Sequence, residues 1–224
     1  FNGNIIISGA FGLFLKSVVI AAGGYDSSTM GEDMELVGRL HEFSRMNRKP
    51  YKIHFAQDAI CWSQTPEKLS ELGKQRKRWQ RGLFQCMWGH RKMLANPRYG
   101  AVGLLSYLYF LLYELLSPFI ELLGVLTMVL SVVMDMLNVK FMLVFLACYA
   151  LYGILLTLTA YFSRIYTIDQ RLSFRKLILA ITACFFETTF LRFYLAFVRV
   201  TAFVGYKKNK LNWGKLERKK MNKI

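Results

Sequence analysis

The sequence predicts an α/β lobe followed by an α-helical membrane region. Two runs typical of strands, 4–14 and 51–62, alternate with helix-like segments in the first hundred residues. Beyond position 100, the apolar residues cluster into runs of the length that crosses a bilayer. The chain has 224 residues, of which 54% are hydrophobic, so it is too apolar for an ordinary soluble domain. A soluble lobe joined to a membrane region is the natural division.

The charge distribution indicates which partners the protein binds, and the cysteine spacing indicates whether it has disulfides or a zinc site. The formal net charge is +16, and the cations concentrate in 74–98 and 207–223. Such blocks suit phosphate-bearing partners, namely anionic lipid, a nucleotide-sugar or nucleic acid. Because these blocks flank apolar runs, we expect no nucleic acid. The four cysteines show no CxxC or CxxH spacing, so we expect neither a disulfide framework nor a zinc site.

The first elements are a strand and a short helix. Residues 4–14 begin as an Ile-rich buried strand and then become Gly-bearing. Gly9 and Gly12 permit close approach of another molecule, although a strand bulge or a packing glycine is the commoner explanation of such residues. Residues 16–22 form a short helix that stops at Gly23-Gly24.

An acidic pair begins the next helix. Glu32 and Asp33 lie at its N-terminus, and an apolar face follows at Leu36, Val37, Leu40 and Phe43. Pro50 prevents the helix from continuing. The two carboxylates either complement the helix dipole or belong to a site. The second strand, 51–62, comes next. His54 and His90 are isolated, and we interpret both as structural histidines.

A basic helix over 65–96 carries the densest functional pattern. Thr65 is its expected cap and Pro66 its first residue. Gln75, Arg78 and Trp79 are three and four apart and therefore share one face. Arg grips phosphate with a planar fork, and an indole packs against the C–H face of a sugar. The alternative is a basic helix on anionic lipid, with its Trp anchored at the interface.

The membrane region contains three apolar segments. We expect an interfacial helix over 99–115 that turns near Ser117-Pro118 into a span reaching 134, and a second span over 141–162. A cytoplasmic lobe and a basic cytoplasmic tail require an even number of crossings, so we interpret 177–204 as re-entrant or interfacial. In the alternative, 101–134 is a hairpin and 177–204 is a true span.

Two motifs together resemble a known family. Glu32-Asp33, followed by Gln75-x-x-Arg78-Trp79, resembles the paired signature of membrane-embedded family 2 glycosyltransferases. That family includes synthases of cellulose, chitin, hyaluronan and poly-N-acetylglucosamine. The resemblance extends to Ser8–Gly12, Gly23–Asp26 and Trp213-Gly214-Lys215, so it covers nearly the whole chain but only the C-terminal portion of such an enzyme.

The resemblance implies a three-part organisation. Residues 1–98 would be the acceptor-side part of a GT-A, Rossmann-like α/β domain. Residues 99–206 would hold the interfacial and transmembrane helices, and 207–224 a basic cytoplasmic tail. The protein would be a multi-pass protein of the cell inner (plasma) membrane.

The resemblance also implies roles for individual residues. The reaction would be an inverting transfer from a nucleotide-sugar, with UDP-sugar the expected donor, to a polysaccharide or lipid-linked acceptor. Ser8-Gly9-Ala10 falls where cellulose synthases have Cys-Gly-Ser, and this departure leaves the identity of the acceptor open. The resemblance implies that Asp33 is catalytic, with Glu32 in support. It implies that the donor diphosphate is bound by Arg78, Arg76 and Gln75. The acceptor would be bound by Trp79, Ser8, Gly9 and Ala10.

The implied metal has no ligands in this sequence. Such enzymes hold a divalent metal, Mg or Mn, with Asp residues of an earlier half, and no DxD triplet occurs here. We therefore expect the chain to be inactive by itself. A non-enzymatic transporter component or scaffold is the competing function, but it does not explain why the acidic pair and the basic motif occur together.

Overall fold

In the computed structural model the chain divides into two compact units. The structure describes residues 3–7, 9–48, 51–56, 59–61, 63–168, 173–209 and 211. Unit 1 contains the chain up to Phe55, Cys61–Ser117 and the segment from Val198 onward; unit 2 contains Ala56–Ile60 and Pro118–Phe197. The predicted domain boundaries at 98 and 206 stay predictions.

Regular structure in the described ranges is entirely helical, so the α/β prediction is wrong. No strand occurs in the described parts of 4–14 and 51–62. The physical reason is that a strand needs a neighbour for its ladder hydrogen bonds. Alternating Ile and aromatic residues indicate only that a segment would fit a pleated, half-buried surface. Ile5 is nevertheless buried, with 3% of its surface exposed.

Unit 1 begins with two helices that match the predicted segments. Helix α1 (Lys16–Ala21) is followed by Gly23 and Gly24, whose φ angles of 98° and 76° lie in the left-handed region that favours glycine. Helix α2 (Glu32–Met46) begins at the acidic pair, after Gly31 as N-cap. The His41 Nε2 donates to the Asn4 carbonyl over 2.8 Å and so holds the extended first segment on α2.

Helix α3 (Leu69–Gly89) starts later than predicted. Its N-cap is Lys68, so the predicted cap at Thr65 and first residue at Pro66 are wrong. Residues 67–70 are exposed, and a helical turn there would have no packing to stabilise it. The C-terminal end is also earlier than predicted, because α3 gives way to the short turns η1 (Arg91–Met93) and η2 (Pro97–Tyr99).

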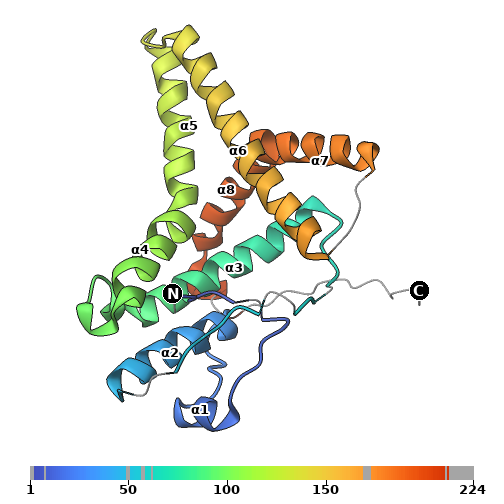
Figure 1. The fold of residues 1–224 in the computed structure, drawn as a ribbon. Helices are drawn as coiled ribbons and strands as arrows, with labels where there is room; N and C mark the ends of the chain where they lie inside the picture. Colours follow the sequence, from blue (N-terminus) through green and yellow to red (C-terminus); the bar gives the residue numbers. More distant parts are fainter. Residues whose placement is uncertain are drawn as a thin grey trace. The chain divides into compact units, whose positions relative to one another are not determined.

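The core of unit 1 lies between α2, α3 and the segment that follows them. That segment consists of η3 (Val102–Ser106), α4 (Tyr107–Tyr109) and η4 (Phe110–Leu115). Figure 1 shows α2 and α3 side by side, and the main core cluster joins them. Two short elements near the C-terminus, η6 (Thr201–Phe203) and α9 (Tyr206–Asn209), belong to the same unit. The buried members of the cluster are Ile5, Met34, Leu83, Cys86, Met87, Met93, Tyr99, Val102, Tyr107 and Leu115.

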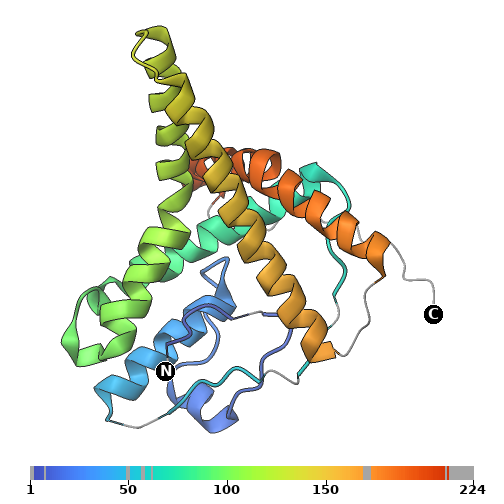
Figure 2. The same ribbon diagram turned by 45° about the horizontal axis from the view of Figure 1, so that its top comes forward.

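Unit 2 is built from long apolar helices. Helices α5 (Ser117–Val133) and α6 (Val139–Ile168) are joined at one end by a short turn and diverge from it in Figure 1; Figure 2 shows the same two helices from a second direction. Helix α7 (Phe174–Phe186) packs on α6 and continues through η5 (Glu187–Leu191) into α8 (Arg192–Val200). The predicted break before Ser117-Pro118 is confirmed.

One ion pair joins the helices of unit 2. The Arg192 guanidinium donates to Glu121 Oε1 over 2.8 Å and 3.1 Å. It also lies 5.3 Å from the centroid of the Tyr149 ring. Three helices, α5, α6 and α8, therefore each contribute one member to this cluster.

Two helices among the described residues are long and apolar enough to cross a membrane. They are Val139–Ser163, which matches the predicted span over 141–162, and Phe174–Phe203. Phe174–Phe203 is long and apolar enough for a span, whereas the sequence analysis interpreted 177–204 as re-entrant or interfacial. Val102–Leu115 with Ser117–Val133 is a third candidate, as a bent pair. The number of crossings stays a prediction, and most of the basic tail, including Trp213-Gly214-Lys215, lies outside the described residues.

Candidate functional site

The two sequence motifs meet at a contact between two glycines. A Cβ atom added to Gly82 of α3 would lie 3.0 Å from both Cα and N of Gly31, and one added to Gly31 would lie 3.1 Å from Gly82 Cα. The N-terminus of α2 therefore touches the backbone of α3. Asp33 follows Gly31 by two residues, and Trp79 precedes Gly82 by about one helical turn. We call this place the glycine junction.

Polar contacts hold the loop before α2 on α3. The Gln85 Oε1 accepts hydrogen bonds from the Met30 amide over 2.8 Å and from the Thr29 hydroxyl over 3.2 Å. The Cys86 thiol donates to the Met34 carbonyl over 3.3 Å. The sequence analysis missed Gln85 and Cys86, although both lie three and four residues beyond Gly82 and so share its face of the helix.

The Cys86 thiol is a structural group. Burial, together with the carboxylates of Glu35 and Asp33, raises the pKa of Cys86 to about 12. The thiol therefore stays protonated at neutral pH and is no nucleophile.

Asp33 lies against the backbone of Gly9. Its Oδ1 accepts a hydrogen bond from the Met34 amide over 2.9 Å. A Cβ atom added to Gly9 would lie 2.6 Å from Asp33 Oδ2. The structure thus brings together two of the predicted site residues. Glu32 is half-buried beside Asp33 and Ala10 is exposed, while Ser8 lies outside the described residues.

Trp79 is exposed and carries a cation on its ring. Its side chain is 45% exposed, and the Arg76 guanidinium carbon lies 4.7 Å from the ring centroid. Arg76 Nε is buried and has no hydrogen-bond partner in the described structure. Gln75 and Arg78 are half-buried on the same helix. The predicted cation, amide and indole are therefore all present within α3, and the role of each stays a prediction.

A metal has no evident ligand set in this part of the chain. Among the described residues, no group of three or more His, Cys, Asp and Glu side chains lies close enough to hold an ion. The described residues therefore supply no ligand set for the divalent metal that the sequence resemblance implies, and that metal stays a prediction. The chemistry available at the glycine junction is that of a carboxylate and of the α3 cations.

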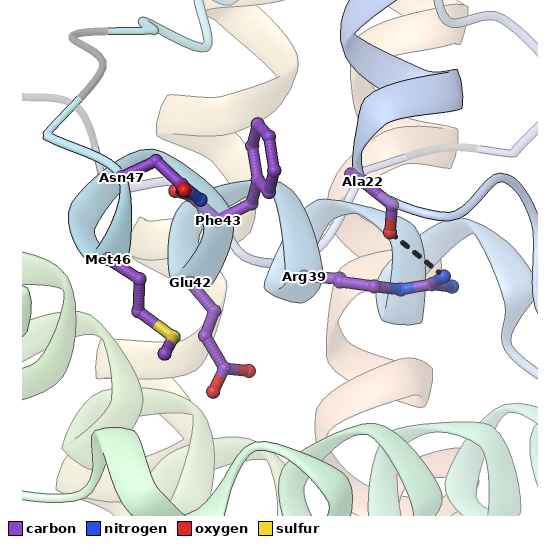
Figure 3. Close-up of a pocket in the computed structure, with 6 residues that line it drawn as sticks. All are labelled: Ala22, Arg39, Glu42, Phe43, Met46 and Asn47. Atoms are coloured by element: carbon purple, nitrogen blue, oxygen red, sulfur yellow. Dashed lines mark hydrogen bonds between the residues drawn. The ribbon is translucent and has the colours of Figure 1, made fainter.

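A shallow hollow lies elsewhere on α2. Figure 3 shows the side chains around it, and its volume is about 330 Å³. Arg39 donates to the Ala22 carbonyl over 3.3 Å and also pairs with Glu35, so its charge is already neutralised. The hollow is distinct from the predicted site residues. It is lined by Ala22, Arg39, Glu42, Phe43, Met46 and Asn47.

Charged side chains fasten the end of α3 to α2. His90 Nδ1 lies 2.9 Å from Glu42 Oε2, and its Nε2 lies 3.7 Å from Glu35 Oε1. Burial by itself would lower the pKa of His90, but the nearby Glu35 carboxylate and the hydrogen bond to Glu42 outweigh it and leave that pKa raised. Burial likewise opposes the charge of Glu35, yet the neighbouring His90 ring and the hydrogen bonds from Arg39 leave its pKa lowered. His90 is thus structural, as the sequence analysis interpreted it.

Comparisons with known proteins agree with the motif pair. Residues 2–82 match the model of the family described as glycosyltransferase like family 2. The match ends at Gly82 and so contains both halves of the glycine junction. No solved structure matches the chain.

Two curated relatives illustrate the likeness. The poly-beta-1,6-N-acetyl-D-glucosamine synthase of Staphylococcus aureus is 37% identical over 90 residues, which are 40% of this chain and 19% of that protein. The synthase of the same name from Staphylococcus epidermidis is 36% identical over 90 residues, with the same shares. The chain thus spans about a fifth of the length of these relatives. On the family match and these identities, residues 2–82 are similar to the family 2 glycosyltransferases.

Proposed function

We propose that this chain is the acceptor-side and membrane part of an inverting glycosyltransferase. Sugar passes from a nucleotide-sugar to a growing polysaccharide or a lipid-linked acceptor. The observation that carries the proposal is the contact of Gly31 with Gly82, because it joins the acidic motif to the basic helix. A dipole-complementing acidic pair or a lipid-binding helix alone would need no such contact.

The chemistry needs a base, a holder for the departing diphosphate and a platform for the acceptor. The acceptor hydroxyl oxygen bonds to the anomeric carbon, and the bond from that carbon to the phosphate oxygen breaks. The nucleoside diphosphate leaves with the electron pair, and the hydroxyl proton passes to the Asp33 carboxylate. Glu32 supports the geometry of Asp33.

Residues of α3 take the remaining tasks. Arg78 neutralises the diphosphate, with Arg76 and Gln75 beside it on the same helix. Trp79 stacks on the terminal sugar of the acceptor, which its 45% exposure supports. Gly9 is assigned to the acceptor side together with Ser8 and Ala10, its neighbours in sequence, because its lack of a side chain lets the Asp33 carboxylate lie against its backbone.

The relatives suggest which donor to try first. Because both are named for a polymer of N-acetyl-D-glucosamine, UDP-N-acetylglucosamine is the first donor to test. The apolar helices and flanking basic residues support a multi-pass location in the cytoplasmic membrane, with the lobe and tail on the cytoplasmic side.

The first test replaces the proposed base. In the full-length enzyme, purified in lipid and assayed with a panel of UDP-sugars, Asp33→Asn should reduce transfer by at least about 10²-fold. Asp135→Asn is the control, because Asp135 is exposed in the loop after α5 with a φ of 54° that Asn also adopts. Normal turnover in Asp33→Asn would remove Asp33 from the proposed role.

A second experiment distinguishes two roles for Trp79, binding of the acceptor and anchoring in lipid. Trp79 and Trp88 are both exposed on α3, and each has an Arg over its ring, at 4.7 Å and 5.2 Å. Trp79→Ala should raise the acceptor KM about tenfold or more, whereas Trp88→Ala should not. Equal effects of the two substitutions on membrane retention, with unchanged acceptor kinetics, would favour the lipid anchor instead.

A further inference from the structure

A buried amide next to Trp79 joins three segments of unit 1 that are far apart in sequence. Gln80 is 2% exposed. Its Nε2 donates to the Leu115 carbonyl, 35 positions away, over 3.0 Å. Its Oε1 accepts from Arg199 Nε, 119 positions away, over 2.8 Å. Both ends of the amide are therefore used, which is what a buried polar side chain requires.

Arginines extend the connection on both sides. Arg199 also donates to the Glu114 carbonyl, and the Glu114 carboxylate lies 3.8 Å from its guanidinium. Arg81, the next residue of α3, donates from Nε to the Ala202 carbonyl over 2.8 Å. We call Gln80, Arg81, Glu114 and Arg199 the α3 latch. It accounts for Arg199, a charged residue in an otherwise apolar segment.

The latch fixes the rotation of α3 at the motif. Successive residues of an α-helix point about 100° apart, so one turn samples the whole circumference. Gln80 is hydrogen-bonded to Leu115 and Arg199, and Arg81 to Ala202, so these two residues fix one side of the helix. The next residue, Gly82, lies against the backbone of Gly31. The direction left for Trp79 is the exposed one. A rotation of α3 would therefore have to break a buried hydrogen bond or displace backbone.

We propose that Gln80 and Arg199 are positioning residues that keep Trp79 facing the acceptor. This inference rests on the function proposed above. The latch ties the stacking platform to the end of η4 and to the end of α8, which both lie within apolar helices counted among the candidate spans. Neither Gln80 nor Arg199 touches a substrate; they act through the orientation of Trp79.

The test is a double-mutant cycle on acceptor kinetics in the full-length enzyme. Gln80→Met keeps the length of the side chain and removes both hydrogen bonds. It should raise the acceptor KM about tenfold, in line with the loss of one or two buried hydrogen bonds. Donor hydrolysis without acceptor should change less than about twofold. Gln80→Glu, which still accepts from Arg199, should recover part of the loss.

The cycle with Trp79→Ala distinguishes positioning from general stability. If Gln80 acts through Trp79, the double variant Gln80→Met/Trp79→Ala should have the same acceptor KM as Trp79→Ala. Additive effects, or an unchanged KM in Gln80→Met, would overturn the inference. Thermal unfolding of each variant is measured alongside.

A second variant, Arg199→Lys, tests the same inference if Gln80→Met does not fold. Should Gln80→Met fail to accumulate in membranes, Arg199→Lys keeps the charge and removes the Nε donor; the same KM increase is expected. Arg91→Lys is its control, because the Arg91 guanidinium donates to the Trp88 carbonyl, only three residues earlier in the chain, over 3.0 Å. A wild-type enzyme without sugar transfer would defeat the proposed function, whereas active enzyme with unaltered acceptor KM would defeat only the latch.

Discussion

Gly9 lies directly against the Asp33 carboxylate, so a side chain at this position would displace the carboxylate. In Gly9→Ala the new methyl group would lie 2.6 Å from Asp33 Oδ2, so the carboxylate must move. We expect turnover of the full-length enzyme to fall about 10²-fold, the usual cost of a misplaced reacting group. Unfolding should change little, because Gly9 is exposed.

Gly12→Ala is the control for this change. Its added Cβ would meet the Phe14 ring at 3.0 Å, and a ring can turn aside. Turnover and the thermal midpoint are measured for both variants. Full turnover of Gly9→Ala would show that the Asp33 carboxylate does not need its present position.

His90 gives the lobe a pH-dependent contribution to stability. Because the folded protein raises the pKa of His90, its contribution is complete below the ordinary value of 6.5 and is lost as pH rises through the raised pKa. The lowered pKa of Glu35 gives a contribution present above 4.5 and lost as pH falls through the lowered value. The pair therefore stabilises most between pH 4.5 and 6.5.

The measurement must separate His90 from His41. Burial lowers the pKa of His41, so His41 acts in the opposite direction and loses stability as pH falls through 6.5. We expect the difference in thermal midpoint between wild type and His90→Gln to be larger near pH 6 than near pH 8.5. Exposed His54→Gln is the control. A difference independent of pH would contradict the assignment.

The sequence singles out residues where the signal is local. Trp79 stands out because Gln75, Arg78 and Trp79 share a helix face, and Asp33 because it belongs to an acidic pair at a helix start; their roles stay predictions. Gln80 and Arg199 did not stand out, because the partners of Gln80 lie 35 and 119 positions away. Spacing along a helix carries no information about such contacts.

The packing of α2 on α3 depends on two glycines. Glycine inside a helix costs about 1 kcal/mol relative to alanine. At Gly82, however, a Cβ would lie 3.0 Å from the backbone of Gly31, which cannot rotate away. We expect Gly82→Ala to lower the free energy of unfolding by about 1–3 kcal/mol, the usual cost of overpacking.

Gly89→Ala is the matched control in the same helix. Nothing lies within 4 Å of the Cβ it would add, so it should be neutral or stabilising by up to about 1 kcal/mol. Denaturant unfolding of both variants in detergent measures the difference. A Gly82→Ala variant as stable as Gly89→Ala would refute the backbone contact.

Helices were predicted better than their ends. The start of α2 at the acidic pair, the stop of α1 at two glycines and the break before Ser117 each have a local chemical cause. The start of α3 was wrong because Thr65 and Pro66 are good N-terminal residues for a helix that has nothing to pack against there.

At the scale of the whole molecule, the long apolar helix α6 of the second half was predicted, whereas the sheet predicted for the first half does not form in the described residues. Apolar length decides whether a helix can cross a bilayer, and it is a property of one segment, so α6 was foreseen. A sheet is a property of several segments at once. The strand-like runs 4–14 and 51–62 supplied suitable side chains, but no ladder forms in their described parts.

The contact between Glu121 and Arg192 has a consequence for how the protein is made. The two residues are separated by 71 positions, so the carboxylate emerges from the ribosome well before its partner has been synthesised. A lone carboxylate is poorly tolerated in hydrocarbon. If α5, α6 and α8 enter the bilayer, as the proposed function requires, α5 and α6 reach their final depth only once α8 has been translated, and the three helices are released into the lipid together.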